Sequence, residues 1–280
     1  MKALIDLDIV AYSCSCISDG KQYRLEIPSG SVTSAKKKEL NSICDEYEMP
    51  RDAIETFWEP EPVGHTCHAM KLMIKRVMTR LEIYLDNSAI LLSDDTNFRH
   101  KLDPEYKANR RGQRVPANLI EAKNYLKDQW EARIYPDHEA DDALGILQYH
   151  DFMLNEGQPD KCETIICTID KDLDMIPGWH YNWFKDETYW IEEHEAQRIF
   201  YEQILKGDRV DNIIGLKGIG PVKAAGLLKE VTTEEEMWRI CVQNYITEEQ
   251  DVDNGTTRCL KNARLLWILR KQSQIWEPPK

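Results

Sequence analysis

Short apolar runs alternate along this chain with stretches whose apolar residues recur at helical spacing, and this alternation limits the possible folds more than any other feature. The runs have the length of strands and are "ALIDL" (3–7), "AILLS" (89–93), "ARIY" (132–135), "TIICTI" (164–169) and "HYNWF" (180–184). Helical patterns occupy 65–81, 117–130 and 140–154. Strands separated by helices are typical of a mostly parallel sheet flanked by helices, so we predict an α/β layer fold.

Two parts of the sequence depart from this alternation. Within 20–64, "PSGSVTSAKKK" has the composition of an exposed loop and "WEPEPVG" that of an extended one, so we expect an insertion there and assign it no function. From about Glu187 the strand-like runs stop, and helix-forming sequence punctuated by glycine follows. We therefore expect an α/β core over 1–186 and a helical region over 187–280.

Composition limits where such a chain can act. At 280 residues and 42% hydrophobic content it can bury a substantial core. Its apolar runs are far shorter than the roughly 20 residues of a membrane span, and the N-terminal "MKALIDLD" is charged where a signal peptide is apolar. The eight cysteines are scattered, which favours reduced thiols. We expect a cytoplasmic protein with no membrane partner.

Acidic residues follow the predicted strands. They are Asp6 in the first run, Asp94 after the second, Glu139, Asp141 and Asp142 after the third, and Asp170 and Asp172 after the fourth. The carboxyl ends of parallel strands share one edge of a sheet, so these side chains should meet in one crevice. Crowded carboxylates repel one another, and bound divalent cations remove that repulsion. Oxygen ligands without Cys or His select Mg²⁺ or Mn²⁺, ions that commonly assist attack of water on a phosphodiester.

The net charge of −13 argues against a broad basic surface for nucleic acid, yet two basic islands interrupt the acidic chain. The first, 99–114, has six basic residues against two acidic ones, and the second, 206–229, has five against two. The second contains "GLKGIGPVKAAGLL" (215–228), which we interpret as helix, tight glycine turn and helix, with backbone N–H groups free to approach a phosphate. An ordinary helical hairpin is the alternative.

Other motifs in the second half of the chain bear on the same question. In "GDRVDN" (207–212), Asp208 and Asp211 are three residues apart, on one side of a predicted helical turn. "DKDLDM" begins like an EF-hand loop, but Met175 occupies the position that needs glycine. Pro221 stands where a Walker lysine would follow the glycines. Neither a calcium loop nor a nucleotide loop is therefore predicted.

Six sequence elements occur in an order that resembles the structure-specific 5′-nuclease family, which comprises flap endonucleases, bacteriophage 5′→3′ exonucleases and the 5′-nuclease domain of bacterial DNA polymerase I. The elements are Asp6, "DDTNFRHKLDPEYKANRR" (94–111), "EADD" (139–142), "TIDKD" (168–172), "GDRVDN" (207–212) and "GLKGIGPVKA" (215–224). The resemblance implies a PIN-like 5′-nuclease core with two metal sites, and a helical C-terminal region with a helix-three-turn-helix element that binds duplex DNA.

The resemblance also implies roles for individual residues. The acids of the first metal site are Asp6, Asp94, Glu139, Asp141 and Asp142, and those of the second are Asp170, Asp172, Asp208 and Asp211. Asp8 can replace Asp6 as a ligand, and Asp95 can replace Asp94. Lys107 and Arg110 steer the scissile phosphate and count as catalytic together with Asp170. The implied DNA contacts are Arg99, Tyr106 (stacking on a base), Lys107, Arg110, Arg111, Lys217, Gly218, Gly220 and Lys223.

From the residues and the resemblance together we expect a 5′→3′ exonuclease and flap endonuclease that uses two Mg²⁺ ions, for which Mn²⁺ can substitute. Its substrates would be DNA with a 5′ end, overhang or flap, or an RNA–DNA hybrid. We expect a monomer that serves primer removal or DNA degradation beside a separate DNA polymerase, in the host cytoplasm if the chain is phage-encoded. Two alternatives stay open: a PIN-like ribonuclease, and a non-catalytic protein that binds DNA structures.

Overall fold

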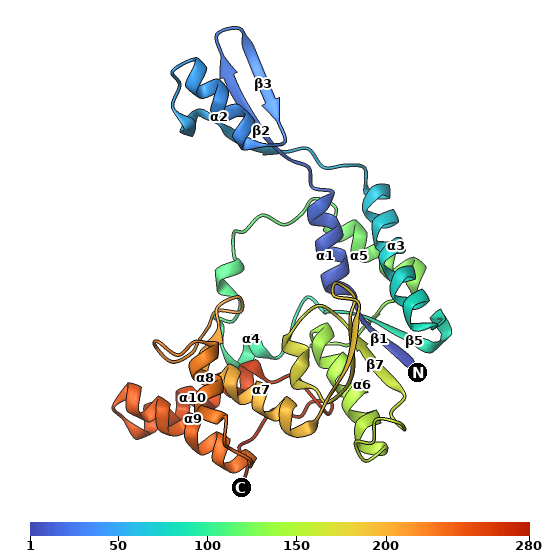
Figure 1. Ribbon diagram of the computed structural model, residues 1–280, viewed down its shortest axis with the longest axis vertical. Helices are drawn as coiled ribbons and strands as arrows, with labels where there is room; N and C mark the ends of the chain where they lie inside the picture. The colour runs from blue at the N-terminus through green and yellow to red at the C-terminus, as the bar shows by residue number, and fades with distance from the viewer. The chain divides into compact units, whose positions relative to one another are not determined.

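The computed structural model describes residues 1–280 and is built on a six-stranded sheet with the strand order β6-β5-β1-β7-β8-β9. The strands are β1 (Lys2–Asp6), β5 (Ser88–Leu92), β6 (Arg133–Ile134), β7 (Thr164–Cys167), β8 (Gly178–Asn182) and β9 (Glu187–Ile191). Neighbouring strands are parallel except β9, which runs antiparallel to β8. The predicted α/β fold with a mostly parallel sheet is confirmed (Figure 1).

The first strand, β1, is mostly apolar because it lies in the middle of the sheet. Ile5 pairs with Ile90 of β5 on one side and Cys167 of β7 on the other. Successive side chains of a strand point to opposite faces of the sheet, and Leu4 and Ile5 are both fully buried, so both faces of β1 are covered. Helix α6 (Ala140–Leu154) packs against β1, β5 and β7 (Figure 1). Asp6 is the last residue of β1, at the carboxyl edge of the sheet.

The prediction that strands stop at about Glu187 is wrong. That residue begins β9, whose backbone pairs with β8 from Gly178↔Ile191 to Asn182↔Glu187. A short hairpin of β10 (Gly207–Asp208) and β11 (Ile213–Ile214) follows further along. Exposure along "ETYWI" falls steadily from Glu187 to Ile191 without the alternation of a half-buried strand, so no local pattern separates it from the helix-forming sequence that follows.

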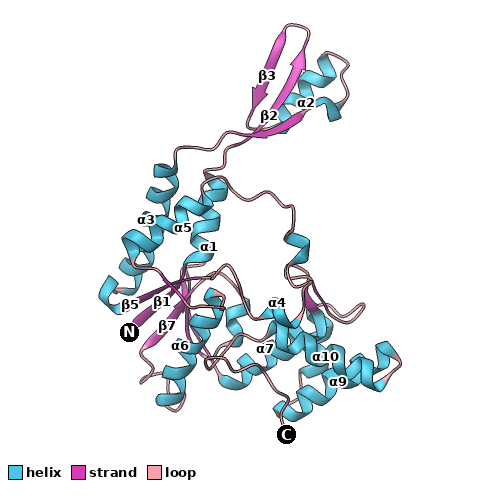
Figure 2. Cartoon of the chain, turned by 180° about the vertical axis from the view of Figure 1, so that it is seen from behind, coloured by secondary structure: helices cyan, strands magenta, loops and turns pink.

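The C-terminal helices form one packed group with the sheet. They are α7 (Glu193–Lys206), α8 (Pro221–Leu228), α9 (Glu234–Glu249) and α10 (Val252–Leu266). Helix α7 packs against α8, α9 and α10, and α9 packs against α10 (Figure 2). The core continues from Leu4 and Ile166 of the sheet through Phe200 and Tyr201 of α7 to Trp276, all nearly or fully buried.

The helix-three-turn-helix element is not confirmed. The glycine stretch 215–220 does lead into a helix, α8, but it follows strand β11 rather than a helix, and the preceding helix α7 already ends at Lys206. The hairpin between them needs two glycines at its base. A Cβ on Gly215 would lie 2.2 Å from the carbonyl carbon of Lys206 and 2.3 Å from the nitrogen of Gly207, so two backbones meet there without side chains.

The chain divides into two compact units. Unit 1 comprises Met1–Ile9, Val77–Gln113 and Ala132–Lys280, and unit 2 comprises Val10–Arg76 and Arg114–Glu131. The sheet and the C-terminal helices thus belong to the same unit, a division that differs from the boundary expected after residue 186. Unit 1 also contains the short helix α4 (Arg99–Leu102), the 3-10 turns at Leu85–Asn87, Ala108–Arg110 and Asp172–Met175, and the C-terminal part of α3 (Val63–Leu81).

Unit 2 holds most of α1 (Leu7–Ile17) and α3, together with α5 (Leu119–Trp130) and a small sheet. The small sheet has the order β3-β2-β4, with β2 (Lys21–Ile27), β3 (Gly30–Ser34) and β4 (Glu55–Trp58) all antiparallel. Helix α2 (Lys37–Glu46) lies beside this small sheet (Figure 2). Its Leu40 and Cys44 pack on Leu25 of β2. The prediction that "PSGSVTSAKKK" is an exposed loop is therefore wrong, since it forms a hairpin turn, β3 and the start of α2.

None of the helices is long and apolar enough to cross a membrane.

Candidate active site

Acidic side chains gather at the carboxyl edge of the six-stranded sheet. Asp6 ends β1, Asp170 and Asp172 follow β7, and Glu139 and Asp141 begin α6, all within unit 1. These residues lie together because the parallel strands all end at the same edge of the sheet. The sequence prediction that separate segments deliver acids to one crevice agrees with this arrangement.

Asp6 lies at the centre of the cluster and is only 2% exposed. Its Oδ1 accepts a hydrogen bond from the Asp8 N–H at 3.1 Å, and its Oδ2 accepts one from the Thr168 hydroxyl at 3.0 Å. Burial and the negative charges of Asp8 and Asp170 raise the pKa of Asp6 to about 7. Asp8 itself accepts a hydrogen bond from the Ser93 N–H at 2.7 Å, so the two acids of this motif have different partners.

Two further carboxyls have raised pKa values. Burial raises the pKa of Asp141, with added repulsion from Asp6, Asp170 and Glu139. Burial also raises the pKa of Asp172 to about 7, with repulsion from Asp170. The Asp172 Oδ1 accepts a hydrogen bond from the Gln203 side chain of α7 at 2.9 Å, which fixes its orientation.

A second group of charges surrounds Asp211. Lys107 contacts Glu139 through its Nζ and lies 3.5 Å from the Asp211 Oδ2. The Arg110 guanidinium lies 2.5 Å from the Asp211 Oδ1. The Lys107 N–H also donates to the Asp211 carbonyl at 3.0 Å, with Lys107 in the left-handed region at φ 56°. The two basic residues expected to meet a phosphate thus neutralise carboxylates here.

Tyr106 is placed differently from the expectation. It is 3% exposed, and its hydroxyl oxygen lies 3.0 Å from the Glu139 Oε2 and 2.9 Å from the Asp211 Oδ2. Its ring packs edge-on against His100. A buried ring cannot stack on a base, so the expected base-stacking role is wrong for Tyr106 as placed here. It bridges two acids instead.

Arg99 and Asp142 form a buried ion pair. Two hydrogen bonds of 2.8 Å join the Arg99 guanidinium to the two oxygens of Asp142, and the residues are 2% and 0% exposed. Burial alone would raise the pKa of Asp142, but the charge and hydrogen bonds of Arg99 hold it below its usual value. The expectations that Arg99 contacts DNA and that Asp142 binds a metal are therefore both at odds with the structure, because neither side chain faces solvent.

The remaining predicted acids are engaged by the backbone. The two oxygens of Asp94 accept hydrogen bonds from the N–H groups of Asp95 and Asp137, both at 2.9 Å. The Asp208 Oδ1 accepts from the Val210 N–H at 2.7 Å. This bond lies in the turn between β10 and β11, so "GDRVDN" forms no helix, although Asp208 and Asp211 line the same recess. Asp95 is exposed beside Asp94.

Part of the cluster encloses a recess of about 30 Å³, which is room for one water-sized group. Its acidic lining residues are Glu139, Asp141, Asp172, Asp208 and Asp211. Oxygen donors under mutual repulsion suit a hard divalent cation, because the ion replaces the protons that the raised pKa values retain. No group of three or more acidic, histidine or cysteine side chains is arranged as a finished coordination sphere. Lys107 and Arg110 form ion pairs with Glu139 and Asp211, and a metal ion bound to these carboxylates would have to displace them.

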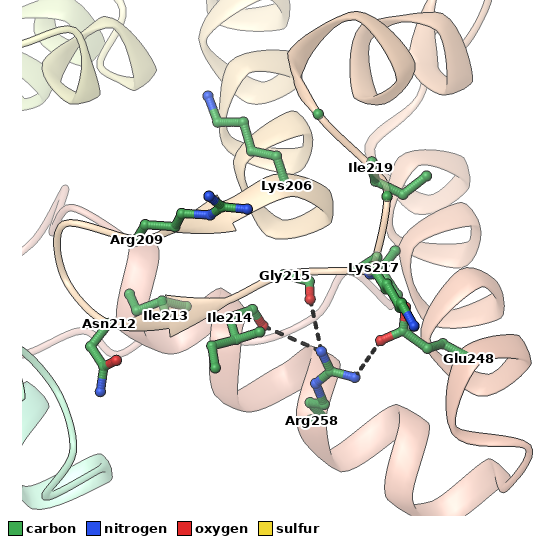
Figure 3. Close-up of a pocket in the computed structure, with 13 residues that line it drawn as sticks. Lys206, Arg209, Asn212, Ile213, Ile214, Gly215, Lys217, Ile219, Glu248 and Arg258 are labelled. Atoms are coloured by element: carbon green, nitrogen blue, oxygen red, sulfur yellow. Dashed lines mark hydrogen bonds and ion pairs between the residues drawn. The ribbon is translucent and has the colours of Figure 1, made fainter. Parts of the chain in front are cut away.

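A larger pocket of about 810 Å³ lies at the glycine turn, and Figure 3 shows its lining. Lys206, Arg209 and Lys217 border it, and Gly218 and Gly220 contribute backbone. The predicted contact Lys223 is exposed on α8 outside this lining. Arg111, also predicted, is exposed and donates to the Pro104 carbonyl at 2.6 Å. The sequence prediction omitted Lys206 and Arg209, although both belong to the second basic island and could have been found from it.

Arg258 of α10 forms hydrogen bonds with residues that line this pocket. Its guanidinium donates to the Gly215 carbonyl at 2.8 Å and to Glu248 at 2.8 Å, as the dashed lines in Figure 3 show. The Lys217 N–H also donates to Glu248, at 2.6 Å. Helices α9 and α10 therefore help to hold the turn, and no local motif signalled Arg258.

Comparison with known proteins decides the family. Residues 53–201, just over half of the chain, match the family model described as "5'-3' exonuclease, N-terminal resolvase-like domain". The chain belongs to the 5′–3′ exonuclease family. One relative of this chain is the "Exodeoxyribonuclease" of Enterobacteria phage T3. It is 28% identical over 227 residues, which cover 77% of this chain and 71% of the phage protein. The "Exonuclease" of Escherichia phage T7 is 27% identical, covering 61% of this chain and 59% of its own length.

Other relatives are much longer proteins, and this chain matches only a part of their sequence. The "DNA polymerase I" of Synechocystis sp. is 28% identical over 62% of this chain but only 19% of the polymerase. Among solved structures, "Divalent metal ions (zinc) bound to T5 5'-exonuclease" has a TM-score of 0.54 at 16% identity, covering 71% of this chain and 80% of that one. "Crystal Structure of T5 D15 Protein Co-crystallized with Metal Ions" has a TM-score of 0.51 at 18% identity, covering 71% and 86%. These structural likenesses establish a common fold.

The raised pKa values predict how a divalent cation should stabilise this family member. Asp6 and Asp172 titrate near pH 7 when folded, against an ordinary value of 3.8, so the folded state holds protons more tightly than the unfolded state. Without metal, the stability that these groups contribute at low pH is lost as the pH rises from about 4 to about 7. We therefore expect Mg²⁺ to raise the melting temperature more at about pH 8 than at about pH 5.5, because only the charged carboxylates bind it.

Thermal unfolding in Mg²⁺ and in EDTA at both pH values measures this effect. Asp6→Asn is the informative variant, since it removes one of the repelling charges. It should raise the melting temperature of the metal-free protein at pH 8 and reduce the gain from Mg²⁺. An equal Mg²⁺-induced gain at both pH values would contradict the coupling.

Proposed function

We propose that this chain is a divalent-metal-dependent 5′→3′ exonuclease and flap endonuclease that hydrolyses phosphodiester bonds near 5′ ends or single/double-strand junctions in DNA. One observation supports the proposal above all: Asp6, Asp141, Asp170 and Asp172 lie at one sheet edge, and burial with mutual repulsion raises the pKa values of three of them. Membership of the 5′–3′ exonuclease family supports the direction of cutting.

We assign the metal ligands to the acids that face one another. Asp6, Asp141 and Asp170, with Glu139, would hold one Mg²⁺, and Asp172, Asp208 and Asp211 a second, with Mn²⁺ able to substitute. Asp94 is left outside both sets, because it does not line the acidic recess and is not among the charges that raise the pKa values of Asp6, Asp141 and Asp172. A bound divalent cation supplies Lewis-acid chemistry and neutralises charge on the reacting phosphate. The reaction adds water to the phosphorus and breaks the bond to the 3′ oxygen, which leaves a 5′-phosphate.

Lys107 and Arg110 are assigned to the scissile phosphate. In the structure they pair with Glu139 and Asp211, and cations bound to those carboxylates would release both side chains. The released charges could then stabilise the additional negative charge of the transition state. Their pairing with these carboxylates keeps two basic groups close to the proposed point of cleavage.

The pocket at the glycine turn is assigned to the duplex. Lys206, Arg209 and Lys217 offer positive charge, and the N-terminus of α8 follows at Pro221, so this surface suits phosphates of the DNA backbone. The T5 structure described as a "pseudo-enzyme-product complex with DNA and metal ions" has a TM-score of 0.50 at 18% identity and shows that this fold can bind DNA in that protein. We further propose a monomer that acts in replication on primers or DNA ends, including RNA–DNA hybrids, with a separate polymerase.

A cleavage assay tests the proposal. The protein is incubated with 5′-labelled duplexes that carry a free end, a blocked end or a 5′ flap, in Mg²⁺ and in EDTA, and with an RNA strand as a further substrate. We expect cutting of flap and 5′-end substrates in Mg²⁺ and none in EDTA. Binding without cutting in either Mg²⁺ or Mn²⁺ would indicate a non-catalytic DNA-binding protein. Cutting confined to RNA would indicate a ribonuclease.

A further inference from the structure

Arg99 is a buried cation whose five N–H donors are all used. Two bond to Asp142, and a third interaction reaches the Glu139 carboxylate at 3.3 Å. The remaining two donate to backbone carbonyls of the C-terminal region, Nε to Leu265 at 2.8 Å and Nη2 to Trp267 at 2.6 Å. A guanidinium has five N–H donors in a rigid arrangement, so every hydrogen-bond donor of the Arg99 side chain has a partner.

Asp142 connects the same segments from the opposite side. Besides Arg99, its Oδ2 accepts a hydrogen bond from the Glu139 N–H at 3.2 Å, and its Oδ1 accepts one from the Leu269 N–H at 3.1 Å. The ion pair thus joins three parts of unit 1: α4, the first turn of α6, and the segment after α10. Buried pairs with every hydrogen-bonding position satisfied hold one geometry.

Glu139 is the point where this network meets the acidic cluster. Its Oε2 accepts from Arg99 and from the Tyr106 hydroxyl, and its Oε1 accepts from the Asn97 side chain at 3.2 Å. Asn97 in turn accepts the Arg99 N–H at 2.8 Å. Arg99 and Asn97 therefore orient this carboxylate together with Tyr106 and Lys107.

Helix α10 links the network to the pocket at the glycine turn. Arg258 and Asn262 of α10 donate to the carbonyls of Gly215 and Ile214 at 2.8 and 2.9 Å. The last turn of the same helix presents the Leu265 carbonyl to Arg99. A continuous series of hydrogen bonds thus runs from the wall of the basic pocket, along α10, through Arg99 to the acids at the start of α6.

We propose that Arg99 is a positioning residue that holds the acidic cluster at a set distance from the glycine-turn pocket, and so determines which phosphodiester is cut. This inference rests on the proposed nuclease function and its assignment of duplex DNA to that pocket. If Arg99 lost its carbonyl bonds, α10 and α6 could shift against each other without unfolding. A misplacement of about 1 Å at a reacting group can cost on the order of 100-fold in rate.

Arg99→Lys tests the proposal, with Arg270→Lys as a matched control. Lysine keeps the charge but cannot reach two carboxylates and two carbonyls from one nitrogen. Arg270 is also buried and lies in the segment after α10. It donates to the Met175 carbonyl at 2.9 Å and packs on Trp267, but it bonds to no acid of the cluster. Cleavage of a 5′-labelled flap in Mg²⁺ is resolved at single-nucleotide resolution, and DNA affinity is measured in EDTA.

We expect Arg99→Lys to lower kcat by about 10- to 100-fold, to leave DNA affinity within about twofold, and to spread the cuts over neighbouring phosphodiesters. Arg270→Lys should lower the melting temperature but keep a single cut position. If both variants lose activity only in proportion to their melting temperatures, with cut positions unchanged, Arg99 is merely structural and the proposal is overturned. Wild-type protein that does not cut in Mg²⁺ would instead refute the proposed function.

Asn97→Ala provides a second test if Arg99→Lys fails to fold. It removes the side chain that bonds both Glu139 and the Arg99 N–H but leaves the buried ion pair intact. We expect the cuts to spread in this variant too, with little change in DNA affinity. A single unchanged cut position in Asn97→Ala would overturn the proposal.

Discussion

Asp170→Asn is expected to lower the cleavage rate by on the order of 1,000-fold or more while leaving DNA binding in place. Burial and neighbouring charges raise the pKa values of Asp6, Asp141 and Asp172, and Asp170 is among those charges for all three. It is therefore the common neighbour of the two groups of acids. Asparagine keeps its shape but removes the charge, so the cluster would hold a divalent cation poorly.

The measurement for this variant is single-turnover cleavage of a 5′-flap duplex in Mg²⁺, with DNA affinity determined separately in EDTA. Asp174→Asn is the matched control, since Asp174 lies in the same loop, accepts a hydrogen bond from the Tyr189 hydroxyl at 2.7 Å and does not line the acidic recess. The control should cut at nearly the wild-type rate. Cleavage by Asp170→Asn within about tenfold of wild type would remove Asp170 from the catalytic assignment.

Lys107→Ala is expected to slow cleavage by about 100- to 1,000-fold, the usual cost of removing one donor that stabilises transition-state charge. The Lys107 side chain is partly buried among Glu139 and Asp211, so its ammonium acts in a medium that screens charge poorly. The same variant should bind Mn²⁺ more tightly than wild type, because the carboxylates lose a competing positive charge. A structural role alone would not combine a slower reaction with tighter metal binding.

Rapid-quench cleavage and Mn²⁺ titration measure the two effects of Lys107→Ala. Lys101→Ala is the control from the same segment, because Lys101 is 71% exposed and pairs with Asp137. It should change neither quantity appreciably. Equal cleavage rates for Lys107→Ala and wild type would remove the phosphate-steering role from Lys107.

The order of strands and acids could be predicted from the sequence because both depend on local patterns. Central strands such as "TIIC" are continuously apolar since both faces are covered, and an acid directly after such a strand can only lie at the sheet edge. The same reasoning failed for β9, a short strand whose pairing with β8 is an antiparallel contact that no local pattern demands. It also failed for β3, whose polar residues become a strand only by pairing with β2.

The roles within "EADD" show the limit of motif reasoning most clearly. Glu139, Asp141 and Asp142 are three carboxylates within four residues, and the sequence offers no means to tell them apart. In the structure Asp142 is fully buried against Arg99, Asp141 faces Asp6 and Asp170, and Glu139 contacts Lys107. The difference arises because α6 turns each successive side chain by about 100°, so each one meets a different neighbour.

The sequence by itself determined the fold class and the family, and it placed acidic residues directly after the strands, because strand periodicity and motif order are properties of neighbouring residues. Only the tertiary structure decided which charges face one another. Arg99 and Asp142 are 43 positions apart, and Tyr106 and Asp211 are 105 apart. Whether such a residue becomes a buried partner, a ligand or a surface contact depends on burial and on distant charges. Packing sets both, and no local pattern encodes them.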